Sequence, residues 1–348
     1  MSAWEKVNLG DICKRITSGG TPKANVSSYY YPPTIPWLKT KEVNYCRITE
    51  TENFISEEGL NNSSAKLIAP NSVIVAMYGQ GDTAGRVAIN KIPLTTNQAC
   101  CNLTIDENKA DYEFIYYQLC TLYNKMVCLK AGAAQPNLNA QIIKNLEVKL
   151  PSLTTQHCIA TILSRYDTLI ENYQKQIKLL EESAQRLYKE WFVELRFPGY
   201  ENTKIVNGLP DGWEKRTIDD VTCKVTTGLN PRKNFVLGKG SNYYVTIKNM
   251  ADNTFFLDDR CDKVDNEALK KINKRSDLKI GDILFSGIGT IGRVALVDIP
   301  TNNWNVSESV FTLRVNDIVT KEFLYLMLLS PDMQNYCQSN AHGAAQKG

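Results

Sequence analysis

The longest regular pattern of apolar positions lies in the middle of the chain. Between Pro151 and Phe197, apolar residues recur at spacings of four and three, which is the heptad pattern of a coiled-coil helix. Pro151 and Ser152 mark the start of this helix, and Phe197-Pro198-Gly199 marks its end. A long helix packed on its own domain is the alternative interpretation. The seam residues that we expect to bind a partner are Ile159, Leu163, Tyr166, Ile170, Tyr173, Ile177, Leu180, Leu187 and Trp191.

On either side of this helix, apolar and polar residues alternate in short runs, and the two sides repeat each other. AWEK at Trp4 returns as GWEK at Trp213. An alternating run that ends in Thr-x-Gly-x-x-Pro occurs at residues 9–23 and again at 218–233. Alternation predicts a strand, and the glycine and proline predict the turn that ends it.

Four further pairs of segments match in the same order. Each copy has the motif Thr-x-Gly-Arg between two β-branched runs, then an apolar run, a helical segment and a loop of small residues. The matched positions are Arg86 and Arg293, Asn97 and Asn305, Glu113 and Glu322, and Gln135 and Gln346. Matches at separations of about 210 residues indicate a duplicated domain rather than the stacked units of a solenoid.

The repeat and the helix together predict the domain organisation. Each copy combines short strands, glycine turns and one helical segment, so we expect an α+β fold with mixed, mostly antiparallel sheet in each. The predicted parts are a first domain at 1–150, the central helix at 151–197, a linker at 198–212 and a second domain at 213–348. A chain of 348 residues, 43% of them apolar, suits two domains with separate cores.

Composition adds little to this picture. A formal charge of +3 permits a DNA partner but does not by itself indicate one. The ten cysteines are scattered and form no CxxC pair, so we interpret nearly all of them as reduced core residues rather than zinc ligands. The sequence has neither a membrane-length apolar run nor a signal peptide, which predicts a soluble, cytoplasmic protein.

The sequence offers little catalytic chemistry. Its two histidines are His157, in the first turn of the long helix, and His342, beside the second small-residue loop. The HExxH, Walker A and GxSxG motifs are all missing. We therefore predict a non-catalytic chain with no cofactor, metal or catalytic residue of its own.

One segment imitates a cofactor-binding loop. Gly287-x-Gly289-x-x-Gly292 follows an apolar run, as in a dinucleotide or methyl-donor site. The repeat copy is one residue longer at this point, so the spacing is not kept. A second strand-like run follows, in place of the helix that would hold a phosphate. We therefore predict a hairpin. An adenine methyltransferase, which would need this loop to bind its methyl donor, is the competing hypothesis.

Taken together, these motifs resemble the specificity subunit of type I restriction-modification systems. The resemblance rests on the AWEK and GWEK openings, IPWLKTKEV at 35–43, GAAQPNLN, and LPSLTTQ at the start of the helix, and it covers essentially the whole chain. It implies that each copy is a target recognition domain that reads one half of a bipartite DNA site. The half-sites would be centred roughly 10 bp apart and would differ, because the copies differ.

The resemblance also implies partners. Two methyltransferase subunits would dock on the helices and methylate adenine with S-adenosylmethionine. Restriction subunits would supply ATP-driven translocation and cleavage. The family's second conserved helix has no counterpart before Gly348, so we expect another chain, or sequence beyond this residue, to supply the partner helix. The alternative is a scaffold or decoy that binds methyltransferase subunits, or dimerises through its coiled coil, without directing modification.

Contact with DNA requires cations and amides at exposed positions, and matched positions in the two copies are the best candidates. Arg86 and Arg293 follow glycine turns, although a salt bridge within the hairpin is the alternative. Gln135 and Gln346 lie in small-residue loops that could approach the duplex closely. In the alternative interpretation, they cap the helix or strand that follows. The candidates are Lys23, Lys39, Lys41, Arg86, Gln135, Arg232, Lys233, Lys248, Arg293 and Gln346. A further basic cluster, either a phosphate contact or a solvated helix face, comprises Lys270, Lys271, Lys274 and Arg275.

Overall fold

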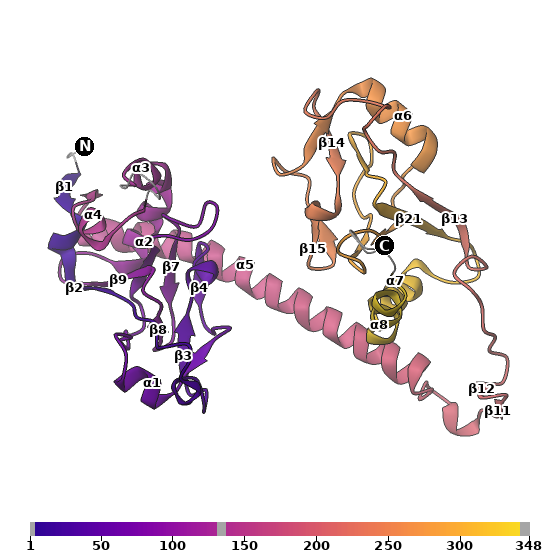
Figure 1. The fold of residues 1–348 in the computed structure, drawn as a ribbon, viewed down its shortest axis with the longest axis horizontal. Coiled ribbons are helices and arrows are strands. Elements are labelled where there is room, and N and C mark those ends of the chain that lie inside the picture. The colour runs from indigo at the N-terminus through magenta and orange to yellow at the C-terminus, as the bar shows by residue number, and fades with distance from the viewer. Residues whose placement is uncertain (1–3, 131–136, 342–348) are drawn as a thin grey trace. The chain divides into compact units, whose positions relative to one another are not determined.

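A computed structural model describes residues 4–130 and 137–341, and the chain forms two compact units, Met1–Tyr173 and Gln174–Gly348 (Figure 1). Helix α5 (Leu153–Tyr188) contributes residues to both units and continues into a π-helical turn at Lys189–Val193. The central helix is therefore where the heptad pattern predicts it. The predicted domain boundaries stay a prediction, because the two units divide within α5.

Unit 1 is built on a five-stranded sheet with the order β2–β9–β6–β7–β4. A three-stranded sheet, β5–β3–β8, and a strand pair, β1–β10, complete it. The strands are β1 (Glu5–Asn8), β2 (Cys13–Ser18), β3 (Ile35–Leu38), β4 (Cys46–Ile48), β5 (Phe54–Ile55), β6 (Val73–Ala76), β7 (Val87–Asn90), β8 (Thr95–Thr96), β9 (Cys100–Ile105) and β10 (Glu147–Leu150). The helices of this unit before α5 are α1 (Glu57–Asn61), α2 (Tyr112–Thr121), α3 (Tyr123–Cys128) and α4 (Ala140–Lys144).

Unit 2 repeats this arrangement with a four-stranded sheet, β13–β21–β18–β19, and a three-stranded sheet, β17–β14–β20. Two short pairs, β11–β12 and β15–β16, are added. The strands are β11 (Ile205–Val206), β12 (Leu209–Pro210), β13 (Thr222–Thr227), β14 (Asn242–Val245), β15 (Met250–Ala251), β16 (Thr254–Phe255), β17 (Asp262–Val264), β18 (Ile283–Ser286), β19 (Val294–Leu296), β20 (Trp304–Val306) and β21 (Val310–Val315). The helices after α5 are α6 (Asn266–Ser276), α7 (Lys321–Leu329) and α8 (Pro331–Ser339).

The duplicated α+β fold, with mostly antiparallel sheet, is confirmed in detail. Each copy has a parallel pair at the same place, β3 with β8 and β14 with β20, and unit 1 has a second parallel pair, β4 with β7. The antiparallel pairs β2–β9 and β13–β21 each contain a register shift, between Cys13 and Arg15 and between Thr222 and Lys224. The glycine-rich segment at 287–292 joins antiparallel strands β18 and β19, so the predicted hairpin is confirmed.

One matched pair was assigned wrongly from the sequence. Leu38 lies beside Thr96, and Val245 lies beside Val306, in the two parallel pairs. The residue after each of these strands is Asn97 in unit 1 and Ser307 in unit 2. Asn97 therefore corresponds to Ser307 and not to Asn305, because strand register, rather than residue type, sets the equivalence.

Two glycines allow the sheets of each unit to approach closely. A Cβ on Gly19 would lie 2.2 Å from the carbonyl oxygen of Asn97, and a Cβ on Gly228 would lie 1.7 Å from that of Val306. Each glycine amide also donates a hydrogen bond to a backbone carbonyl near the start of the partner strand. Gly19 donates to Cys100, and Gly228 donates to Ser307. The Thr-x-Gly-x-x-Pro motif thus needs its glycine for space as well as for a turn.

The units contain more helix than the one segment predicted in each. The predicted segments form α2 and α7, which are capped by Asp111 and Thr320, and a further helix, α3 or α8, follows each. Helices α1 and α6 follow β5 and β17. Helix α1 is short and contains a glycine, so its sequence lacks a long apolar periodicity.

The prediction of core cysteines is only partly right. Cys100, Cys101 and Cys261 are buried, but Cys128, Cys158 and Cys223 are exposed. All ten are free thiols within the described residues. Across residues 4–130 and 137–341, no helix has both the length and the apolar character needed to cross a bilayer.

Candidate nucleic-acid interface

Lys41 and Lys248 occupy the same short turn in the two units. Each turn follows a core strand and is closed by a side chain that bonds to the backbone at its start. The Glu42 carboxylate accepts from the Lys39 amide at 3.0 Å, and the Asn249 side-chain oxygen accepts from the Thr246 amide at 2.9 Å. These bonds present the lysine at a fixed place on the surface.

The two lysines differ in their neighbours. Lys41 forms a salt bridge with Glu52, whereas Lys248 is exposed and has no ion pair within the described residues. Lys39 is also engaged within its own unit, because its Nζ donates to Asn53 at 2.9 Å and lies 5.0 Å from the Trp37 ring centroid. Of these three candidates, Lys248 is the one whose charge has no internal partner among the described residues.

Arg86 and Arg293 support those turns from the glycine hairpins. Arg86 donates to Asn44 at 2.9 Å and to Asp82 at 2.6 Å. The bond from Arg86 holds the pKa of the Asp82 carboxyl below its ordinary value. Arg293 donates to the carbonyl oxygens of Ile247, at 2.8 Å, and of Met250. Both guanidinium groups thus tie a hairpin to the turn that carries a lysine. Arg86 also forms the salt bridge within its hairpin that was named as the alternative, whereas Arg293 forms no salt bridge with a described residue.

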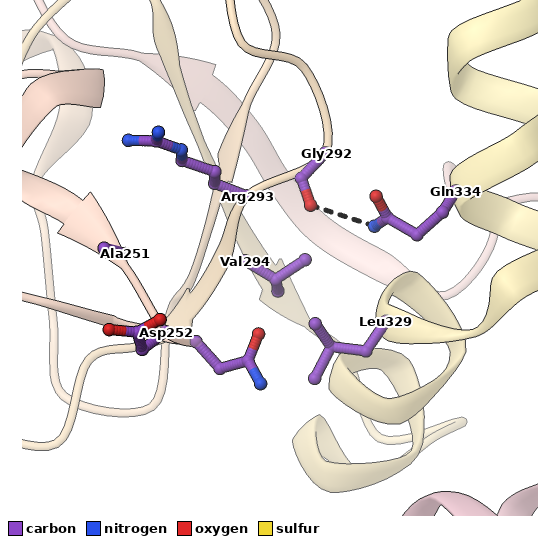
Figure 2. Close-up of a pocket in the computed structure, with 8 residues that line it drawn as sticks. Ala251, Asp252, Gly292, Arg293, Val294, Leu329 and Gln334 are labelled. Carbon is purple, nitrogen blue, oxygen red and sulfur yellow. Dashed lines mark hydrogen bonds between the residues drawn. The ribbon is translucent and has the colours of Figure 1, made fainter. Parts of the chain in front are cut away.

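A pocket of 470 Å³ lies beside Arg293 (Figure 2). It lies between the hairpin, the β15–β16 turn and helices α7 and α8. Gln334 bonds to the carbonyl of Gly292 at 2.9 Å, and a Cβ on Gly292 would lie 2.2 Å from the Gln334 side-chain oxygen. In Figure 2 the Arg293 guanidinium points away from Gln334. Asp252 is the only carboxylate among the residues that line this pocket, so it lacks the paired groups of an acid–base catalyst.

A basic surface of unit 2 lies on α6 and on the loop between β13 and β14. Helix α6 is amphipathic: Leu269 and Ile272 are buried, and Asp265 caps its start. Its outer face contacts this loop and the end of β13, since Lys271 donates to the Asn234 carbonyl at 3.2 Å and Arg275 to the Thr227 hydroxyl at 3.1 Å. We call this the α6 basic surface, and its residues are Arg232, Lys233, Lys270, Lys271, Lys274 and Arg275. All six are exposed, and none forms a salt bridge with a described residue.

The equivalent place in unit 1 has the opposite charge. There α1 carries Glu57 and Glu58 and no cation, and its start is tied to the segment between β2 and β3 by the Ser56 amide, which donates to the Tyr29 carbonyl at 2.9 Å. Lys23, in the segment between β2 and β3, is exposed. The two copies therefore share a scaffold and differ in the charge they present from it.

Sequence reasoning left the α6 cations out of the main candidates, although their spacing on one helix face was visible. Arg232 and Lys233, which were chosen, lie beside them. Gln135 and Gln346 lie outside the described residues, as does His342. His157 has its Nδ1 at 2.7 Å from the carboxylate of Asp111, the cap of α2, so it contributes to the contact between α5 and α2.

The apolar seam of α5 is largely exposed. The exposed fractions of Ile170, Ile177 and Leu180 are 52%, 57% and 70%. Ile159 instead packs against the core of unit 1, and Trp191 is half-buried. The exposed Ile162 and Leu169 widen the stripe beyond the narrow seam that the heptad pattern predicts. The described residues contain no group of three or more side chains that could hold a metal ion.

Comparison with known proteins places these features in a family. A family model described as the type I restriction modification DNA specificity domain matches residues 1–182 and 210–348. The MjaIX specificity subunit of Methanocaldococcus jannaschii is 29% identical and aligns over 71% of this chain and 58% of its own length. A specificity subunit from Escherichia coli is 28% identical over 54% of this chain and 47% of its own length. The chain thus spans only about half the length of these two relatives.

Other comparisons extend over nearly the whole chain. The HindI specificity subunit of Haemophilus influenzae is 22% identical and aligns over 99% of this chain and 86% of its own length. The crystal structure of an S subunit from M. genitalium superposes with a TM-score of 0.56 at 18% identity, over 97% of this chain and 80% of that one. That likeness supports the fold.

Proposed function

The chain belongs to the type I restriction modification DNA specificity family, and from this premise we propose that it reads a bipartite, asymmetric DNA target, one half-site with each unit. The proposal rests on one observation: the two units have the same fold, but they present different charges at the equivalent helix. The three-stranded sheets and four strands of the larger sheets repeat in the same order, whereas α1 is acidic and α6 is basic. Two readers with the same frame and different surfaces favour two different half-sites.

Within this proposal, the DNA backbone is contacted by Lys23, Lys248 and the α6 basic surface. These cations are exposed and have no ion pair within the described residues. Phosphate contacts fix the register of a protein on DNA without reading bases. Arg86 and Arg293 act indirectly, because their bonds hold the turns of Lys41 and Lys248 in place.

The chemistry of methylation and cleavage belongs to partner subunits in this proposal. The exposed seam of α5 is the docking surface for two methyltransferase subunits and a partner helix, since an apolar stripe on a solvated helix is stabilised by burial. The methyltransferase subunits modify adenine and the restriction subunits cleave. The chain itself contributes no catalytic residue.

The direct test compares genome-wide adenine methylation in cells that carry this chain and its methyltransferase subunit with cells that lack the chain. We expect a new motif made of two different half-sites with an unread gap. A chain that is present and associated with the methyltransferase, yet yields no new motif, would contradict the proposal and favour the decoy.

A second prediction concerns the α6 basic surface. Replacing Lys270, Lys271 and Lys274 by alanine should reduce the slope of log K against log salt by about one for each phosphate that the variant no longer neutralises. The decrease in affinity should be equal for target and non-target DNA, because phosphates carry no sequence. Fluorescence anisotropy titrations between about 50 and 200 mM salt measure both quantities.

The matched control removes three exposed lysines elsewhere in the chain, Lys175, Lys178 and Lys204. It should leave the salt slope unchanged. Equal slopes for the α6 variant and the wild type would remove this surface from the DNA interface while leaving target recognition by the chain intact.

A further inference from the structure

Arg47, in β4, is surrounded by carboxylates from two helices. Its side chain is only 7% exposed. Its Nη1 lies 3.2 Å from a carboxylate oxygen of Glu171, and its Nη2 lies 3.7 Å from oxygens of both Glu113 and Asp167. Glu113 belongs to α2, whereas Asp167 and Glu171 belong to α5. A single guanidinium thus joins the sheet, α2 and the long helix.

Two further groups complete the cluster. The Tyr117 hydroxyl accepts from Arg47 at 3.1 Å and donates to Asp167 at 2.5 Å. Burial and the nearby Asp167 carboxylate raise the pKa of Tyr117, so this phenol stays a donor. Lys91 lies 3.2 Å from Glu113. Two cations therefore face three carboxylates, and Arg47 is the cation that reaches α5.

This cluster is the outermost attachment of α5 to unit 1. Nearer the start of the helix, Gln156 and Ala160 are buried against the unit. After Glu171, every residue from 172 to 183 is exposed. The direction in which the helix leaves the unit is therefore set at Asp167 and Glu171, and a free length of about 18 Å follows.

We propose that Arg47 is a positioning residue that fixes the direction in which α5 leaves unit 1, and thereby sets the length of the unread DNA spacer between the half-sites. The proposal rests on the proposed function, in which each unit reads one half-site. Without Arg47, Glu113, Asp167 and Glu171 would repel one another at close range, and the last two attached turns of α5 would lose their fixed place. A small change of direction at this point is magnified along the helix.

Within the described residues, unit 2 has no cation at the position that matches Arg47. Thr254 occupies the position of Arg47 in the repeat, because it lies as far beyond the strand end at Val245 as Arg47 lies beyond Leu38, and it carries no charge. Unit 2 holds its part of α5 by other contacts. Phe192, just after the helix, has its ring centroid 4.8 Å from that of Phe323, and Gln185 donates to the Leu326 carbonyl at 3.4 Å.

The test measures the affinity of the chain, in complex with its methyltransferase subunits, for a series of duplexes. The half-sites are constant, and the spacer changes in steps of one base pair. The wild type should prefer one spacer length. Arg47→Gln should reduce the preference over neighbouring lengths by about tenfold, while the base preference within each half-site stays the same. Arg47→Lys, which keeps the charge but not the fork of donors, should lie between them.

A second variant and a control keep the test decisive. Glu171→Gln removes an exposed partner of Arg47 without altering a buried side chain, and it should also broaden spacer preference. Arg196→Gln breaks exposed ion pairs with Glu190 and Glu194, and it should have no effect. Unchanged spacer preference in both cluster variants, or an equal loss of affinity at all spacers, would overturn the positioning role. A wild type that has no spacer preference would overturn the proposed function itself.

Discussion

Replacing Ile170 and Ile177 by lysine should abolish association of this chain with methyltransferase subunits. Both side chains are more than half exposed in the chain alone, so the change should cost little folding stability. If the seam is covered in the complex, two unpaired charges would be buried, and affinity should fall roughly a hundredfold or more. Co-purification and analytical ultracentrifugation of the co-expressed proteins measure this decrease.

The same helix supplies a matched control. Asn172 and Leu179 are also seven residues apart and exposed, but they lie on the opposite face of α5. Their replacement by lysine adds the same charge and should leave association intact. Loss of association in this pair, with the seam variant still bound, would place the partner on the other face of the helix.

The second large effect is expected from Gly228→Ala. The new Cβ would lie 1.7 Å from the Val306 carbonyl oxygen, an atom of the backbone that cannot rotate away. The two sheets of unit 2 would have to separate at this point, which should destabilise the unit by about 3 kcal/mol. Hydrogen exchange should show reduced protection in β13 and β20, with the amides of unit 1 unchanged.

Gly238→Ala provides the comparison within the same unit. Its φ of 81° strains an alanine, yet nothing lies within 4 Å of the new Cβ. The cost should be about 1 kcal/mol, from the backbone alone. Equal stabilities for the two variants would show that the sheets do not depend on the close approach at Gly228.

The duplicated fold could be predicted because strand alternation, glycine turns and the heptad seam are local patterns. The repeat then extended each local prediction to a second copy. The hairpin at Gly287 followed from comparing the copies, since a lone glycine motif is ambiguous. The residue-by-residue alignment of the two copies was wrong at Asn97. An insertion displaces similar residue types along the sequence, while the strand register stays the same.

The roles of the arginines could not be predicted from the sequence, for a different reason. Arg293 bonds to carbonyl oxygens of Ile247 and Met250, and a backbone acceptor has no signature in residue type. Arg47 meets Glu171, which is distant in the chain, so no spacing rule connects them. The basic face of α6 was visible, but its contact with Asn234 depends on tertiary packing.

The exposed stretch of α5 at 172–183 also has a consequence for folding. The two copies contain matching strands, and a strand of one could pair with the sheet of the other, a known hazard of tandem repeats. When β13 leaves the ribosome, however, every strand of unit 1 has already been synthesised, and a stiff helix separates the copies. The helix delays the second set of strands until the first set can pair among themselves, and so it guards against swapped domains.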